Sequence, residues 1–207
     1  MRFLFIDTET TDLRQRRCVE IGAALFVWDG RTSRRIQTLS SLIQPTGWVI
    51  SKEAREVHGI SMADCRMHGK PLADVMRQFL ALSACADVLV GHNLKFDVEN
   101  IERDHVAVKI QRPDMPGLMW PPARYCTMRE LTSYCALPQP GAHHRRWQVY
   151  KWPRLEELYR LVFRREMPEG HRALDDCLFT AECFFALLGA GIISQNRFTK
   201  KGVKSYA

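Results

Sequence analysis

The chain has 207 residues, and the 46% that are hydrophobic are enough to build one domain with a sizeable core. Its 30 Lys and Arg residues outnumber its 23 Asp and Glu residues, and the net charge of +7 favours a polyanionic partner. No apolar run is long enough to cross a bilayer, so we expect no membrane partner.

The first predicted strand, residues 2–7, is too apolar to lie at a surface, and it leads into two acids. Because side chains two apart on a strand point to the same side, Asp7 and Glu9 are expected to project together. Two neighbouring carboxylates repel each other, so they either keep a proton or hold a cation. The alternative is that residues 7–10 form only a polar turn after the strand.

Strands are also predicted at 18–28 and 35–44, before a region of alternating helices and strands. In that region, residues 87–91 are typical of a buried strand, and helical spacing follows from Leu94 to about Ala107. Asp97 therefore falls in the first turn of a helix at the carboxyl end of a strand, where α/β proteins place active sites. The alternative is that it only complements the helix dipole.

Two irregular stretches, 110–124 and 138–153, flank the next predicted elements, and a helix is expected at 154–163. The second stretch interleaves cations with aromatic side chains, as a platform that stacks single-stranded bases does. Its relevant residues are Arg145, Arg146, Trp147, Tyr150 and Trp152. Solvated charge with local packing accounts for the same residues without a ligand.

A strongly amphipathic helix is predicted at 173–188, and it carries Asp176. Pro168 and Gly170 make a loop of the preceding stretch, which carries His171. An imidazole in a loop beside a carboxylate on a helix suits a general base beside a metal ligand. The alternative is a solvent-exposed loop histidine.

The seven cysteines form no CxxC pair and are predicted to be reduced thiols of a cytoplasmic protein. The first strand begins at residue 2, which leaves no room for a signal peptide, so a cytoplasmic location is expected.

Taken in order, these acids lie in three motifs, Asp-x-Glu-Thr-Thr-x-Leu at 7–13, His-Asn-x-x-Phe-Asp at 92–97 and His-x-Ala-x-x-Asp at 171–176. They resemble the exonuclease motifs of the DnaQ-like (DEDDh) 3′-5′ exonucleases, the family of the proofreading epsilon subunit of DNA polymerase III. Val-Glu-Ile-Gly-Ala at 19–23 and Val-His-Gly-Ile at 57–60 are similar to secondary marks of that family. The resemblance covers about residues 3–189.

The resemblance implies an α/β, ribonuclease-H-like exonuclease fold, in which helices flank a mixed central β-sheet. We expect one exonuclease domain over residues 1–190 and a short basic C-terminal tail over 191–207. One family position differs: Cys126-Thr127 stands where relatives often carry Asp-Thr.

For the chemistry, the resemblance implies two divalent ions, Mg²⁺ or Mn²⁺, that support phosphodiester hydrolysis. Asp7, Glu9, Asp97 and Asp176 would hold the ions, and His171 would take a proton from the attacking water. Asp175 adjoins Asp176, but the family spacing from His171 selects Asp176, and a helical step of about 100° turns Asp175 away.

The resemblance also implies residues that line or shape the site for the terminal nucleotide. They are Thr8, Thr10, Glu53, His58, Ile60, Asn93 and Phe96. Alternatives stay open for four of these residues. Ile60 and Phe96 also suit the core, Asn93 suits a helix cap, and Thr10 suits a bond within its own turn.

The leading function is therefore a 3′-5′ DNA exonuclease that proofreads or trims ends and releases nucleoside 5′-monophosphates. One alternative is an exoribonuclease that trims RNA 3′ ends with the same acids. Another is a non-catalytic nucleic-acid-binding accessory subunit of a polymerase. The expected partners are DNA 3′ ends, single-stranded ones in particular, with RNA 3′ ends as the alternative. Association with a DNA polymerase, or with a second copy of the chain as a homodimer, is left open.

Overall fold

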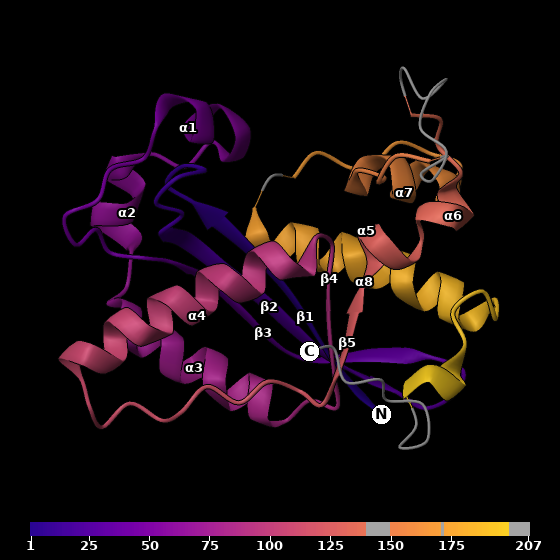
Figure 1. The fold of residues 1–207 in the computed structure, drawn as a ribbon, viewed down its shortest axis with the longest axis horizontal. Coiled ribbons are helices and arrows are strands. Elements are labelled where there is room, and N and C mark those ends of the chain that lie inside the picture. Colours follow the sequence, from indigo (N-terminus) through magenta and orange to yellow (C-terminus); the bar gives the residue numbers. More distant parts are fainter. Residues whose placement is uncertain (140–149, 171, 199–207) are drawn as a thin grey trace.

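A computed structural model describes residues 1–139, 150–170 and 172–198, and it contains a five-stranded sheet in the order β3-β2-β1-β4-β5. The strands are β1 (Arg2–Thr10), β2 (Cys18–Trp28), β3 (Ser33–Leu42), β4 (Val88–Gly91) and β5 (Ala123–Cys126). β1 is antiparallel to β2 and parallel to β4, and β4 is parallel to β5, so the sheet is mixed. The predicted mixed sheet flanked by helices is confirmed (Figure 1).

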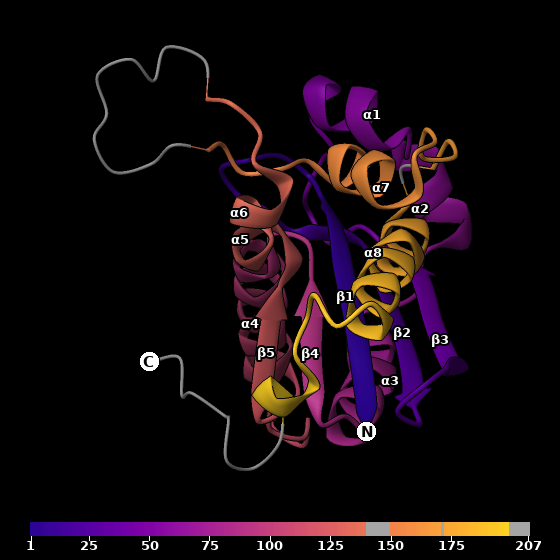
Figure 2. The same ribbon diagram turned by 90° about the vertical axis from the view of Figure 1, so that its right-hand side faces the viewer.

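Helices cover both faces of this sheet (Figures 1 and 2). They are α1 (Lys52–His58), α2 (Met62–His68), α3 (Leu72–Ala84), α4 (Leu94–Gln111), α5 (Thr127–Glu130), α6 (Thr132–Cys135), α7 (Leu155–Phe163) and α8 (Ala173–Gly189), with a final 3₁₀ turn at Gln195–Phe198. α3 and α4 share one core with the sheet, and α8 shares the other. α7 packs on α8, where the rings of Tyr159 and Phe179 lie 5.6 Å apart.

The alternation of side chains along β1 explains why it is the central strand. Leu4 and Ile6 are buried in the core of the α3/α4 face. Phe3 and Phe5 are buried on the other face, where the ring of Phe184 on α8 lies 5.1 Å and 5.6 Å from theirs. A strand with apolar residues at both odd and even positions must be covered on both sides, which places its polar end between two layers of helices.

The predicted elements differ from the observed ones mainly at their ends. β1 continues to Thr10, so residues 7–10 belong to a strand, and the alternative of a polar turn is wrong. The strand expected at 35–44 lies two residues earlier, at Ser33–Leu42, because Trp28 pairs with Ser33 across the turn that contains Gly30. The three predicted helices at 94, 154 and 173 are confirmed to within four residues at each end.

Gly22 on β2 determines how closely α8 approaches the sheet. A Cβ atom built at this position would lie 2.3 Å from the carbonyl carbon of Ala173, the first residue of α8. No side chain fits there, so glycine is required for the start of α8 to rest on β2. The acids in the first turn of α8 are thereby brought beside β1.

The described parts of the two irregular stretches lie at opposite ends of the sheet (Figure 1). The stretch after α4 is fastened to the helices, since Pro116 accepts a hydrogen bond from His105 at 2.8 Å and Met119 accepts one from Ser83 at 2.7 Å. It leads into the amino end of β5, away from the carboxyl ends of β1 and β4 (Figure 1).

The second stretch is described only at its base. Pro138 and Tyr150 form a β-bridge, and the Lys151 amide donates to the Leu137 carbonyl at 3.0 Å. Arg145, Arg146 and Trp147 lie outside the described residues, as does His171.

Within the described part of the chain, no helix combines the length and the apolar character needed to cross a bilayer. Beyond α8, Ile193 and Phe198 are buried, and Phe198 packs edge-on against Phe3 at 5.6 Å. The first residues of the predicted tail therefore lie against the domain.

Candidate active site

Three carboxylates meet where β1 passes beneath the first turn of α8. Asp7 and Glu9 extend from the side of β1 that faces α8, and Asp176 comes from the helix itself. Their nearest oxygen atoms all lie within 4.8 Å of one another. Three hard oxygen ligands at this spacing suit a divalent cation such as Mg²⁺ or Mn²⁺.

Asp97 approaches the same region from α4. Its side chain is buried, and its Oδ1 accepts a hydrogen bond from the Thr8 hydroxyl at 2.8 Å. The Thr8 oxygen in turn accepts one from the Asn100 amide at 3.2 Å. This chain of bonds fixes Asp97 beside β1, so the structure brings all four acids predicted as metal ligands into one region.

The electrostatics of this region favour a cation. Burial raises the pKa of Asp7 well above its usual range, and the charges of Asp97 and Glu9 raise it further. Burial and the charge of Asp176 raise the pKa of Glu9 to about 8. Burial also raises the pKa of Asp97 to about 7, against the lowering effect of the bond from Thr8. Buried carboxylates that lie close together are hard to ionise at the same time. A divalent ion bound among them would stabilise their anionic forms.

A buried ion pair anchors α8 beside these acids. Glu20 lies opposite Glu9 in the β1–β2 register and is fully buried. Its two oxygens accept bonds from Arg172 at 2.7 Å and 2.9 Å, and one of them also accepts the Ala173 amide at 3.1 Å. Glu20 therefore ties the residue before α8, and the start of α8 itself, to β2.

Sequence reasoning named Glu20 only as part of the 19–23 motif and missed this role. The signal available in the sequence was a charged residue inside a strand that is otherwise apolar. A buried charge of that kind needs a partner.

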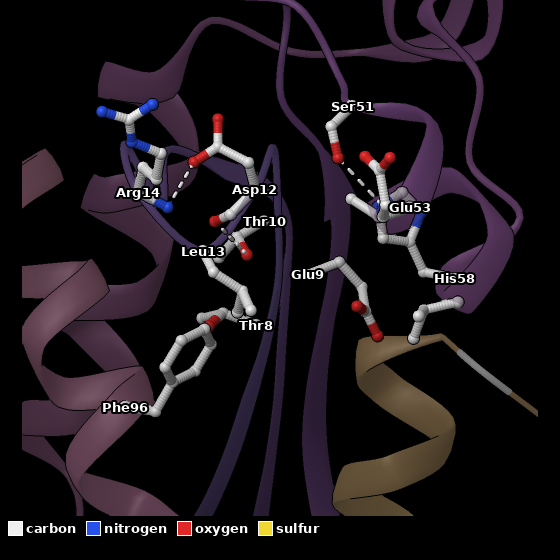
Figure 3. A pocket seen from close by; sticks show the side chains of 12 residues that line it. Thr8, Glu9, Thr10, Asp12, Leu13, Arg14, Ser51, Glu53, His58 and Phe96 are labelled. Atoms are coloured by element: carbon white, nitrogen blue, oxygen red, sulfur yellow. Dashed lines mark hydrogen bonds between the residues drawn. The ribbon is translucent and has the colours of Figure 1, made fainter.

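Beside the carboxylates lies a pocket of about 640 Å³ between β1, α1 and the start of α4 (Figure 3). Of the residues predicted to contact the terminal nucleotide, five line it: Thr8, Thr10, Glu53, His58 and Phe96. Figure 3 shows the Glu9 side chain directed from this pocket toward the first turn of α8. The pocket and the three-carboxylate cluster therefore share Glu9.

The other two predicted residues do not line the pocket. Ile60 is buried in the α3/α4 core, as its alternative interpretation expected. Asn93 is exposed in a left-handed conformation at the start of α4, and its side chain makes no capping hydrogen bond. The alternative that Asn93 caps the helix through its side chain is therefore wrong.

Two residues that line the pocket are held by local bonds. The Thr10 hydroxyl donates to the Asp12 carbonyl at 3.4 Å, so it bonds within its own turn. His58 accepts the Ile60 amide at Nδ1 at 3.0 Å, which places the ring proton on Nε2. Burial lowers the pKa of His58, so the ring is a neutral donor at neutral pH.

His92, in the second motif, connects three segments at the carboxyl end of β4. Its Nδ1 lies 2.9 Å from the Thr127 hydroxyl, and its Nε2 lies 3.0 Å from the Pro153 carbonyl. Burial lowers the pKa of His92 to about 4, so the ring is neutral. Cys126 replaces the acid found in relatives, but Thr127 still supports the second motif through this bond.

The fold and the carboxylate cluster define a metal-dependent nuclease. The profile of the RNase_T exonuclease family matches residues 4–184, and the chain belongs to this family of DnaQ-like 3′-5′ exonucleases. A sequence search of curated proteins gives no match.

Similar folds occur in solved structures of exonuclease I. The E. coli enzyme in complex with a dT13 oligonucleotide aligns with a TM-score of 0.68 and 18% identity, over 96% of this chain and 43% of that one. Its zinc-bound complex with single-stranded DNA gives 0.66 and 19%, over 95% and 41%. Exonuclease I of Methylocaldum szegediense gives 0.66 and 18%, over 95% and 41%. The chain thus spans less than half the length of these proteins.

Proposed function

We propose that the protein removes nucleotides from the 3′-hydroxyl ends of single-stranded DNA and releases nucleoside 5′-monophosphates. The observation that carries this proposal is the cluster of Asp7, Glu9 and Asp176 at the edge of a nucleotide-sized pocket. The exonuclease I structures bound to single-stranded oligonucleotides support DNA as the substrate.

Asp7, Glu9, Asp97 and Asp176 are proposed as the ligands of two divalent ions, Mg²⁺ or Mn²⁺. When bound, the ions would supply the charge that stabilises a pentacovalent phosphate and the leaving 3′-oxygen. Asp97 is positioned for this role by Thr8, and Asp176 by the Glu20–Arg172 pair. The raised pKa values of Asp7 and Glu9 support the need for compensating positive charge.

His171 is proposed as the general base. It directly precedes Arg172 in the sequence, and Arg172 is bound by Glu20. A neutral imidazole would take one proton from the water whose oxygen bonds to the phosphorus, while the bond from phosphorus to the 3′-oxygen of the preceding nucleotide breaks. That 3′-oxygen takes up a proton, which leaves a new 3′-hydroxyl end and a 5′-monophosphate.

The pocket is proposed to bind the terminal nucleotide. Phe96 offers an aromatic face, and His58 lines the pocket as a neutral ring. Thr8, Thr10 and Glu53 supply polar groups for the sugar. Ile60 lies behind the pocket and would act by holding His58 in position. Asn93 would act by shaping the start of α4.

This activity fits proofreading in DNA replication and end-trimming in DNA repair. Both roles are compatible with a polymerase partner or with a homodimer. A cytoplasmic location remains part of the proposal, in keeping with seven free cysteines.

The test is a time course with 3′-labelled and 5′-labelled single strands of DNA and RNA of matched sequence. Each is incubated with Mg²⁺, with a chelator, and with the Asp7→Ala variant. We expect metal-dependent shortening from the 3′ end of DNA that is lost in the variant. Faster cleavage of RNA would replace the proposed substrate, and no cleavage of either strand by folded protein would overturn the nuclease assignment.

A further inference from the structure

A tryptophan and an arginine form an exposed pair beside the candidate active site. Trp152 is 50% exposed, although it precedes α7 on a segment with several hydrogen bonds. The guanidinium of Arg129, on α5, lies 5.6 Å from the centre of its ring. Such a pair combines a stacking surface with positive charge, which are the two features of single-stranded nucleic-acid sites.

The segment that carries Trp152 is fixed in place. Lys151 donates its amide to Leu137 at 3.0 Å, and the Pro153 carbonyl lies 3.0 Å from His92. Arg154 donates its amide to Glu157 at 2.8 Å, and Lys151 pairs with the same carboxylate. An aromatic ring on a segment that is already ordered loses little conformational freedom when a ligand binds to it.

The pair lies on a path that leads away from the pocket. The pocket lies on the α1 side of β1, while α5 and the segment before α7 lie on the other side of the carboxyl end of β1 (Figure 1). His92 joins that segment to the end of β4, five residues before Asp97. If the last nucleotide of a strand fills the pocket and its phosphate reaches the carboxylates, the preceding nucleotides can extend to the side of β1 that carries Trp152.

The charges along this path suit a phosphate backbone. Lys95 is exposed in the first turn of α4, and Arg129 is exposed on α5. Three acids, Glu99, Glu102 and Glu130, line one groove with Lys95 and Arg129, and each has a partner. Glu99 pairs with Arg16 at 3.2 Å and lies 3.6 Å from Lys95, Glu102 accepts a bond from Trp120, and Glu130 pairs with Arg197. Glu157 is paired with Lys151. The whole chain carries a net charge of +7.

We propose that Trp152 and Arg129 bind a nucleotide upstream of the scissile bond, with a base stacked on Trp152, and that they thereby favour single-stranded DNA long enough to reach them. This inference rests on the proposed function, because it uses the direction in which the strand leaves the pocket. It adds a second contact outside the carboxylate site and the terminal pocket.

The test measures binding without cleavage, by fluorescence anisotropy of labelled oligo-dT in the Asp7→Ala background. Trp152→Ala should raise the dissociation constant of a 12-mer by about fivefold or more. Trp152→Phe should recover part of the loss because it keeps an aromatic face. Trp152→Ala should raise the dissociation constant of a dinucleotide less, because a dinucleotide is too short to reach Trp152.

A matched control removes the same charge from an arginine elsewhere. Arg77 lies on α3 and pairs with Asp114 at 2.9 Å, and it does not line the groove that contains Arg129. Arg129→Ala should weaken binding, and Arg77→Ala should not. Equal effects of the two variants, or a Trp152→Ala protein that binds the 12-mer as its parent does, would overturn the proposal.

The two proposals fail in different ways. A wild-type protein that binds DNA but cleaves none overturns the nuclease function, while the comparison at Trp152 in the Asp7→Ala background still decides the second contact. Circular dichroism melts of each variant confirm that lost binding is not lost folding.

Discussion

At the scale of single residues, the structure gives two adjacent acids different surroundings. Asp176 joins the cluster with Asp7 and Glu9, whereas Asp175 lies against Gly170, where a Cβ atom would be 3.2 Å from its own. The helical step of about 100° between neighbours explains this difference. Spacing in the sequence therefore selects the residue that the fold brings to the cluster.

We expect Asp176→Ala to lower the exonuclease rate by at least about 100-fold, because it removes a proposed ligand of the metal ions that would stabilise the reacting phosphate. Asp175→Ala should keep most of the activity. Rates on a labelled 12-mer under saturating Mg²⁺ check this, with thermal melts to show that both variants fold. Equal losses in two folded variants would refute the assignment.

The raised pKa values predict how the metal-free protein responds to pH. In the folded protein the pKa of Glu9 is about 8, against an ordinary value of 4.5. The folded state therefore holds more protons than the unfolded state between about pH 4.5 and pH 8. The free energy of unfolding should fall across this window as pH rises, by several kcal/mol at most, since one pKa unit is about 1.4 kcal/mol.

Urea midpoints at pH 5, 7 and 9 with a chelator test this expectation. Glu9→Gln should show a smaller fall than the wild type, and saturating Mg²⁺ should flatten the curve. Glu53→Gln is the control, because Glu53 lines the same pocket but is exposed. A wild-type midpoint that rises with pH would contradict the prediction.

At the scale of elements, the position of α8 depends on β2. Gly22 permits the close approach, and Glu20 holds Arg172 and the first amide of the helix. Because Asp176 follows within one turn, the docking of α8 also places a proposed metal ligand. In the Glu20–Arg172 ion pair, the Arg172 side chain is 46% exposed to solvent. We therefore do not expect loss of this ion pair to unfold the protein.

Glu20→Gln should weaken Mn²⁺ binding and lower kcat by about 10- to 100-fold, the usual cost of losing a residue that orients metal ligands. The KM for DNA should change less, because Glu20 does not line the pocket. Calorimetric titration with Mn²⁺ gives a measurement independent of activity. Ser40→Ala, which removes only a 3.4 Å bond to Glu20, is the matched control. Normal Mn²⁺ affinity in folded Glu20→Gln would disprove the positioning role.

The sequence predicted the parts of the site that depend on local patterns. Alternation along β1 put Asp7 and Glu9 on one side, and helical spacing put Asp97 and Asp176 in first turns, as observed. The bonds of Glu20 and His92 were not predicted. They depend on strand register and on which distant segment packs nearby, and neither property follows from local periodicity.

At the scale of the whole molecule, charge complements the shape of the site. The net charge of +7 is spread over a chain whose candidate active site is itself acidic. Long-range attraction therefore acts on the phosphate backbone while the cluster attracts cations. These two effects respond differently to the composition of the solution.

Binding of oligo-dT should weaken by about 10-fold between 50 and 200 mM salt, as expected when a few phosphates release their counterions. Lys95→Ala should reduce the slope of log affinity against log salt by about 0.7, the value for one contact on a single strand. Anisotropy titrations in the Asp7→Ala background measure both. A slope near zero would show that the charge does not contribute to binding.

The acids that make up the cluster come from the two ends of the fold: Asp7 and Glu9 from its first strand, and Asp176 from its last long helix. Chains are synthesised from the amino end and fold domain by domain. A nascent chain on the ribosome therefore carries β1 long before it carries α8. The proposed nuclease therefore cannot complete its carboxylate cluster until α8 has been translated, and a partly made chain lacks Asp176.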